Sequence, residues 1–177
     1  QAGDWLSLFG SEIKRGFTHV IPEGLDHIWF VLGVFLMTRK MKPLVLQVSA
    51  CTVPHTLALW LASAGIVRVP AAIVEPVIAA SIVAVALENI FHKRYTHWRL
   101  LVVFAFGLIH GLGFAGVMST RLDSTSSLVV GLLGINVGVE LGQLAVITAA
   151  LLATIRISGS PNYRKYVVIP GSLVIAL

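Results

Sequence analysis

Long apolar segments, separated by short polar or proline-rich stretches, run along most of the chain. Each has about the 17 to 25 residues that a helix needs to cross a bilayer. A final apolar segment begins at Tyr166 and continues to Leu177. The complete segments cover residues 17–38, 43–64, 73–92, 98–119 and 128–155. The pattern predicts an all-α polytopic membrane helix bundle of about six transmembrane helices over residues 16–177.

Residues 1–15 follow a different pattern, in which apolar and charged side chains fall on opposite sides of a helix. Trp5, Leu8 and Phe9 lie on one side, whereas Glu12 and Lys14 lie on the other. A short amphipathic helix of this kind typically lies in the membrane surface, where tryptophan acts as an anchor. We therefore expect an interfacial amphipathic segment ahead of the bundle.

The composition supports a membrane protein and argues against several other classes. The chain of 177 residues is 56% hydrophobic and 12% charged, whereas soluble domains carry about 25% charged residues. The isoelectric point is about 9.8, but no basic stripe alternates with aromatic residues, so nucleic acid is not an expected partner. The lipid bilayer is an expected partner. The single cysteine, Cys51, excludes an internal disulfide and a cysteine-based zinc site.

Lys and Arg are unevenly distributed between alternate loops, and this asymmetry predicts the orientation. One set comprises Arg39, Lys40, Lys42, Lys93, Arg94, Arg99, Arg156, Arg164 and Lys165. The smaller set comprises Lys14, Arg15, Arg68 and Arg121. The positive-inside rule places the larger set in the cytoplasm. The N-terminus then lies outside, which suits a signal peptide cleaved ahead of Gln1.

Residues of metal-ligand type fall at similar depths in four predicted spans. With a rise of 1.5 Å per residue, Asp26 and His27 lie about 14 Å below the outer surface. His55 and His110 come out at about the same depth, and Glu140 lies within about a turn of it. Neutral imidazole and carboxylate together bind Zn, Ni, Co, Fe and Mn. We predict a metal site near the bilayer midplane, formed by these residues.

Further polar residues extend this site. His19 and Glu23 share one helical face with Asp26 and His27, and His19 is expected to be a ligand near the outer mouth. Glycines beside His110 would let neighbouring backbones approach it closely. The remaining candidates, which would line the pathway or support the ligands, are Glu23, Glu75, Glu88, His92, Asn136 and Gln143.

The charges in the spans are expected to be mainly acidic. Asp and Glu occur within the apolar segments or at their edges, whereas no Lys or Arg is predicted to lie deep in one. An acidic interior without cationic partners requires either a bound cation or protonated carboxyl groups.

Several motifs, in order, resemble the HupE/UreJ family of bacterial membrane proteins. They are the Asp26-His27 pair followed by an apolar run, the E-x-x-I-A-x-S-I pattern from Glu75, FGLIHGLGFAG around His110, and INVGVELGQ over residues 135–143. The resemblance covers nearly all of the chain from Gly16 onward. It implies a nickel or cobalt permease of the inner membrane, with a signal peptide and about six transmembrane helices. It also implies that His19, Asp26, His27 and His110 are site residues.

Two functions remain open on this sequence. The first is a permease for a divalent transition metal, nickel, cobalt or zinc, in which Glu88 and His92 release the ion at the far side. The second is an intramembrane zinc hydrolase, in which Asp26 or Glu140 serves as a base. We favour the permease. The sequence also leaves open whether the chain forms homo-oligomers.

Overall fold

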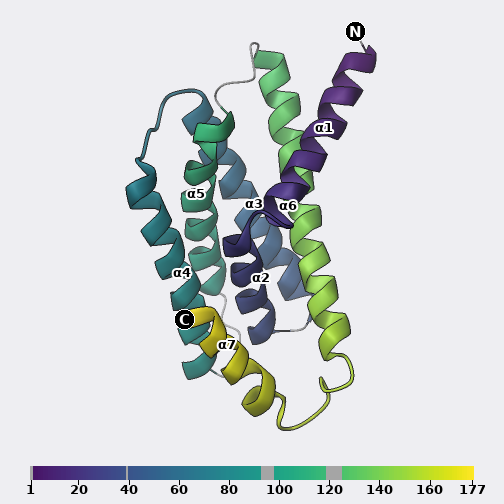
Figure 1. Cartoon of the computed structure of the whole chain (residues 1–177), viewed down its shortest axis with the longest axis vertical. Helices are drawn as coiled ribbons and strands as arrows, with labels where there is room; N and C mark the ends of the chain where they lie inside the picture. Colours follow the sequence, from purple (N-terminus) through teal and green to yellow (C-terminus); the bar gives the residue numbers. More distant parts are fainter. Residues whose placement is uncertain (1, 39, 93–97, 119–124) are drawn as a thin grey trace.

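The computed structural model describes all residues except 1, 39, 93–97 and 119–124, and its described residues form a bundle of helices (Figure 1). The helices are α1 (Ala2–Val20), α2 (Leu25–Met37), α3 (Met41–Ser63), α4 (Ala71–Phe91), α5 (Trp98–Met118), α6 (Thr125–Thr154) and α7 (Ile169–Ala176), with a π-helical turn, η1 (Arg164–Val168), before α7. Large apolar side chains such as Trp60, Leu101 and Leu133 are exposed on the outside, as expected for contact with lipid. The predicted all-α membrane bundle is confirmed.

Among the described residues, fewer helices than the predicted six are long and apolar enough to cross a bilayer. Three qualify, in α3, α4 and α6, and a fourth span results if α1 and α2 are counted together. The described apolar part of α5, Trp98–Gly113, is shorter. The predicted sixth span corresponds to η1 and the eight residues of α7. Arg39, Lys93, Arg94 and Arg121, which entered the orientation argument, lie outside the described residues.

The predicted first span, 17–38, is not one helix, and this part of the prediction is wrong. α1 continues through residue 20, and α2 starts at residue 25 after a bend of 72°. Pro22 disfavours helix at the residue before it and cannot donate a backbone hydrogen bond. Gly24 allows the tight turn between the two helices, because a Cβ at this position would collide with the carbonyl oxygen of His19. Figure 1 shows α1 reaching the middle of the bundle, where α2 begins.

Glycines bring α1 directly against α6. Gly134, Gly138 and Gly142 follow one another at every fourth residue of α6 and face α1. A Cβ on Gly138 would collide with the carbonyl oxygen of Ile13, and one on Gly16 with that of Ile135. Small residues at this spacing allow helix backbones to pack closely in membranes. The boundary predicted between residues 15 and 16 falls inside α1, and the surface location of residues 1–15 stays a prediction.

A second close helix pair, α3 and α5, positions two of the predicted site residues. A Cβ on Gly107 would collide with the carbonyl oxygen of Cys51, and one on Gly111 with that of His55. The predicted role of these glycines in close backbone packing is therefore confirmed. Because Gly111 follows His110 directly, this packing places the His110 ring next to the helix that carries His55.

Candidate metal centre

Four histidines and one aspartate from separate helices converge in the interior. His19 lies in the last turn of α1, Asp26 and His27 lie in the first turn of α2, His55 lies in α3 and His110 lies in α5. We call these five residues the histidine cluster. The break between α1 and α2 brings three of its members together, since the chain bends by 72° between His19 and His27 and places their rings in contact.

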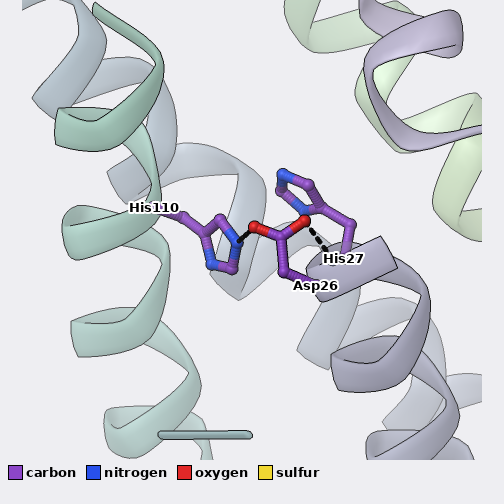
Figure 2. Close-up of side chains that lie close together, drawn as sticks. All are labelled: Asp26, His27 and His110. Atoms are coloured by element: carbon purple, nitrogen blue, oxygen red, sulfur yellow. Dashed lines mark hydrogen bonds and ion pairs between the residues drawn. The ribbon is translucent and has the colours of Figure 1, made fainter. Parts of the chain in front are cut away.

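Asp26 connects the two sides of the histidine cluster. Its Oδ2 lies 2.7 Å from Nε2 of His110, and its Oδ1 accepts a hydrogen bond of 3.0 Å from the backbone N–H of His27. Figure 2 shows the carboxylate between the two imidazole rings. One ligand atom from each of Asp26, His27 and His110 can be chosen so that all three lie within 4.8 Å of one another. This spacing suits three ligands of a single metal ion.

The other two histidines lie close to this group. Nε2 of His19 is 3.1 Å from Nε2 of His27, near the separation of two nitrogens that bind one ion at about 2.0 to 2.1 Å. The ring centroid of His55 lies 5.9 Å from that of His27 and 6.4 Å from that of His19. The rings of His27 and His110 are 4.2 Å apart. The ring of His27 therefore lies at the centre of the four imidazoles, with the other three ring centroids 4.2 to 5.9 Å away.

Burial gives the histidine cluster a free-energy cost that a cation would relieve. His27, His55 and His110 are 0%, 1% and 3% exposed. Nδ1 of His27, Nδ1 of His110 and both ring nitrogens of His55 are buried without a hydrogen-bond partner among the described residues. Unpaired buried polar atoms are costly. Nitrogen lone pairs beside a carboxylate match the donor set of borderline transition metals, so the residues fit a metal ion.

The carboxylate of Asp26 is the partly exposed member of the compact ligand group. The side chain of Asp26 is 38% exposed, whereas that of His110, its partner, is 2% exposed. The negative charge of this carboxylate thus lies between the exposed surface and the buried imidazoles. In this position it would attract a cation toward them.

The structure places the predicted ligand Glu140 in a separate contact. Its Oε1 accepts a hydrogen bond of 3.2 Å from Ser49 on α3, and it is not one of the three residues in the compact ligand group. Ser49 lies six residues before His55, which is about 9 Å along the helix. A ligand role for Glu140 stays a prediction.

The predicted supporting amides bond elsewhere than to Glu140. Oε1 of Gln143 accepts a hydrogen bond from Thr52, and its Nε2 lies 4.0 Å from the sulfur of Cys51. Nδ2 of Asn136 donates to the carbonyl oxygen of Leu132 within α6. Gln143 therefore joins α6 to α3, and a supporting role of these two amides toward the ligands stays a prediction.

Three other pathway candidates lie at the surface. Glu23 is exposed in the turn between α1 and α2, and Glu75 is exposed on α4. His92 is exposed at the end of α4, where its backbone carbonyl accepts a hydrogen bond from Arg164. Their predicted roles in a pathway remain predictions.

Arg99 is a fully buried cation at the start of α5, and its contacts were not predicted from the sequence. It is 0% exposed, and its guanidinium donates to Glu88 Oε2 at 2.6 Å, to Gln47 Oε1 at 3.0 Å and to the carbonyl oxygen of Gly33 at 3.2 Å. Glu88, predicted to pair with His92, thus pairs with Arg99. Counting Arg99 as a loop residue missed this contact, although the apolar run that follows it directly was a signal for a place inside the helix.

The apolar exterior and the buried histidines beside Asp26 define the class, a helical membrane protein with an interior site suited to a metal ion. A family model described as HupE / UreJ protein matches residues 1–177, and the chain belongs to this family. The resemblance seen in the sequence is confirmed. No curated protein and no solved structure matches the chain.

Proposed function

We propose that this protein carries a divalent transition metal ion, nickel or cobalt, across the bacterial inner membrane, and that the ion binds at the histidine cluster on its way. Membership of the HupE/UreJ family supports handling of these metals. The observation that carries the proposal is the convergence of His19, Asp26, His55 and His110 around the fully buried His27.

The protein treats the ion as cargo, so the site has to release what it binds. Most of its candidate donors are neutral imidazoles, which bind Ni²⁺ and Co²⁺ without a high density of negative charge. Asp26 is the only carboxylate in the compact ligand group of the described residues. A single anionic ligand favours entry of a dication. It also limits the binding free energy that the ion must overcome when it leaves the site.

The orientation of the protein extends this proposal. The face where α2 and α4 end and α3 and α5 begin, which we call the Arg99 face, also holds Lys40, Lys42 and Arg164. By the positive-inside rule it lies in the cytoplasm. The ion would then enter from the periplasm, with the N-terminus on that side.

Metal binding by the purified protein tests the proposal most directly. Nickel and cobalt affinities are measured by calorimetry for the wild type and for His27→Ala, His110→Ala and His92→Ala in detergent. We expect the first two substitutions to weaken binding by more than about tenfold, in line with losses on perturbing metal sites. His92→Ala removes an exposed imidazole outside the cluster and should leave the affinity unchanged.

Transport itself is measured in proteoliposomes that contain a metal-sensitive dye. Uptake of nickel or cobalt by the wild type, lost in His27→Ala and His110→Ala and retained in His92→Ala, is the expected result. Binding that does not depend on His27 or His110 would refute the site. One equivalent of zinc that resists dialysis and shows no transport would instead indicate a catalytic or structural metal.

A further inference from the structure

On three helices, a histidine of the cluster is followed toward the Arg99 face first by an apolar residue and then by a residue that contacts Arg99 or is Arg99 itself. On α2 the order is His27, Phe30, Gly33; on α3 it is His55, Cys51, Gln47; on α5 it is His110, Phe106, Arg99. The intervals are four residues on α3 and four and seven residues on α5, which keep each of these two series on one side of its helix. From the first to the last member, the distance along the helices is roughly 9 to 16 Å.

The middle positions form a tightly packed apolar layer. The rings of Phe30 and Phe106 stack with centroids 3.7 Å apart and planes 8° apart. Both rings are at most 2% exposed, as is Cys51. The ring of Phe106 also contacts that of His110, with centroids 4.3 Å apart. A hydrated ion that leaves the cluster toward the Arg99 face therefore meets two stacked aromatic rings.

The third positions form a polar layer around the buried guanidinium of Arg99. Arg99 from α5 binds Glu88 from α4, Gln47 from α3 and the Gly33 carbonyl from α2. Asn89 of α4 donates to the same carbonyl oxygen at 2.7 Å. One guanidinium thus holds four helices together. We call this contact set the Arg99 network.

These two layers together oppose the passage of a cation. An apolar constriction resists entry of water and ions, and a buried guanidinium repels a dication that approaches it in a medium of low dielectric constant. Glu88 is the compensating anion, but its carboxylate is occupied by Arg99. If the contact between Arg99 and Glu88 breaks, the guanidinium no longer holds the helices together through this bond. At the same time, the Glu88 carboxylate becomes available to a passing cation.

We propose that the Phe30–Phe106 stack and the Arg99 network form a gate that closes the histidine cluster toward the Arg99 face, with the Arg99–Glu88 ion pair as its latch. The interpretation as a gate for a transported metal rests on the proposed function. The closure itself is a physical property of the protein and can be tested without any metal.

The single cysteine provides a native reporter. Cys51 lies in the middle layer, between His55 and Gln47 on α3, and is 2% exposed. Its modification by a membrane-impermeant maleimide is timed in spheroplasts and in inverted membrane vesicles, which expose opposite sides of the membrane. A Lys40→Cys variant in a Cys51→Ala background identifies the side on which the Arg99 face lies.

We expect slow modification of wild-type Cys51 from both sides. Phe106→Ala opens the apolar layer, Glu88→Gln removes the charge of the latch, and Arg99→Gln removes its cation. Each should accelerate labelling by tenfold or more from the side of the Arg99 face and leave the opposite side unchanged. Lys40→Gln removes a cation on the same face outside the network and should label like the wild type.

Two results would overturn the gate. Labelling at the wild-type rate in all three variants would show that the layers do not limit access. Acceleration from both sides would show that the substitutions only loosen the bundle. Gel filtration and thermal unfolding identify this case independently. Phe106→Ala provides a variant in which the Arg99–Glu88 ion pair is left intact. A positive labelling result alongside failed metal binding would leave the closure standing and refute the proposed function instead.

Discussion

Asp26 is the residue on which the charge of the histidine cluster depends. Its carboxylate bonds His110 through one oxygen and the backbone of His27 through the other. It is also the most exposed of the three residues in the compact ligand group. Its charge therefore acts both on an arriving cation and on the orientation of two imidazoles.

Asp26→Asn should lower nickel or cobalt affinity more than about tenfold, since it removes the anionic ligand while keeping nearly the same shape. Calorimetry of the purified variants measures the affinity. Glu23→Gln is the matched control, because it neutralises an exposed carboxylate three residues away. Equal losses in the two variants would mean that Asp26 contributes only to the general surface charge.

The sequence predicted the members of the histidine cluster, but not how they meet. Counting depth along predicted helices placed Asp26, His27, His55 and His110 in one layer with Glu140 within a turn of it; the structure brings the first four together, whereas Glu140 contacts Ser49. His19 was assigned to the outer mouth because 17–38 was treated as one helix. Its true position depends on a turn at Pro22 and Gly24, and helical periodicity cannot describe a change of direction.

At the scale of the elements, backbone contacts between helices determine the position of the cluster. α5 lies so close to α3 that Gly107 and Gly111 have no room for a side chain. The positions of His55 and His110 relative to each other follow from this contact, because each belongs to one of the two helices.

Gly111→Ala should destabilise the bundle by about 1 to 3 kcal/mol, the usual cost of overpacking. The added methyl group would collide with the carbonyl oxygen of His55, which belongs to a helix backbone and cannot rotate away. Unfolding of the detergent-solubilised protein by a denaturing surfactant provides the measurement. The substitution should also weaken metal binding, because it moves His110 away from His55.

Gly10→Ala is the matched control for this substitution. No described atom outside the neighbouring backbone lies within 4 Å of a Cβ at that position of α1. It should be neutral or stabilising by roughly 0.5 to 1 kcal/mol, since alanine favours helix over glycine. If Gly111→Ala proved equally harmless, the tight packing of α3 on α5 would be contradicted.

Most helix boundaries could be predicted from the apolar pattern. The predicted spans 43–64 and 73–92 correspond to α3 and α4 within two residues at each end. Helix length and composition determine these elements locally. The break near residue 22 and the short α7 could not be predicted in this way, since a run of apolar residues has the same appearance whether it is straight, bent or only partly helical.

At the scale of the whole molecule, polar groups occupy two levels that an apolar layer separates. The level of the histidine cluster can hold a cation. The level of the Arg99 network already contains one, the guanidinium of Arg99. The sequence could not show this second level, because its members come from four helices and only Arg99 and Glu88 are charged. Pairing between helices distant in sequence requires knowledge of the packing.

The Arg99–Glu88 pair should show strong non-additivity in stability. Arg99→Met alone leaves a largely buried carboxylate without its partner and should cost about 3 to 5 kcal/mol. The double variant Arg99→Met, Glu88→Leu removes both charges and should be less destabilised than Arg99→Met alone. The free energies of unfolding of the wild type, both single variants and the double variant form the required cycle.

Simple addition of the two single effects would contradict a direct interaction between the side chains. The same cycle with Arg164→Met in place of Arg99→Met serves as a control. Arg164 donates to the carbonyl oxygens of Ile90 and His92 rather than to a carboxylate, so it should add independently to Glu88→Leu.

The bend between α1 and α2 also makes the histidine cluster sensitive to movement. His19 belongs to a helix held against α6 by close backbone contacts, whereas His27 belongs to the segment that follows the bend and packs against α4. The two imidazoles therefore lie on different sides of the bend. If the proposed ion binds to both of them, a rotation about residues 21–24 that moves α2 relative to α1 would change the distance between their ring nitrogens and would couple this movement to release of the ion.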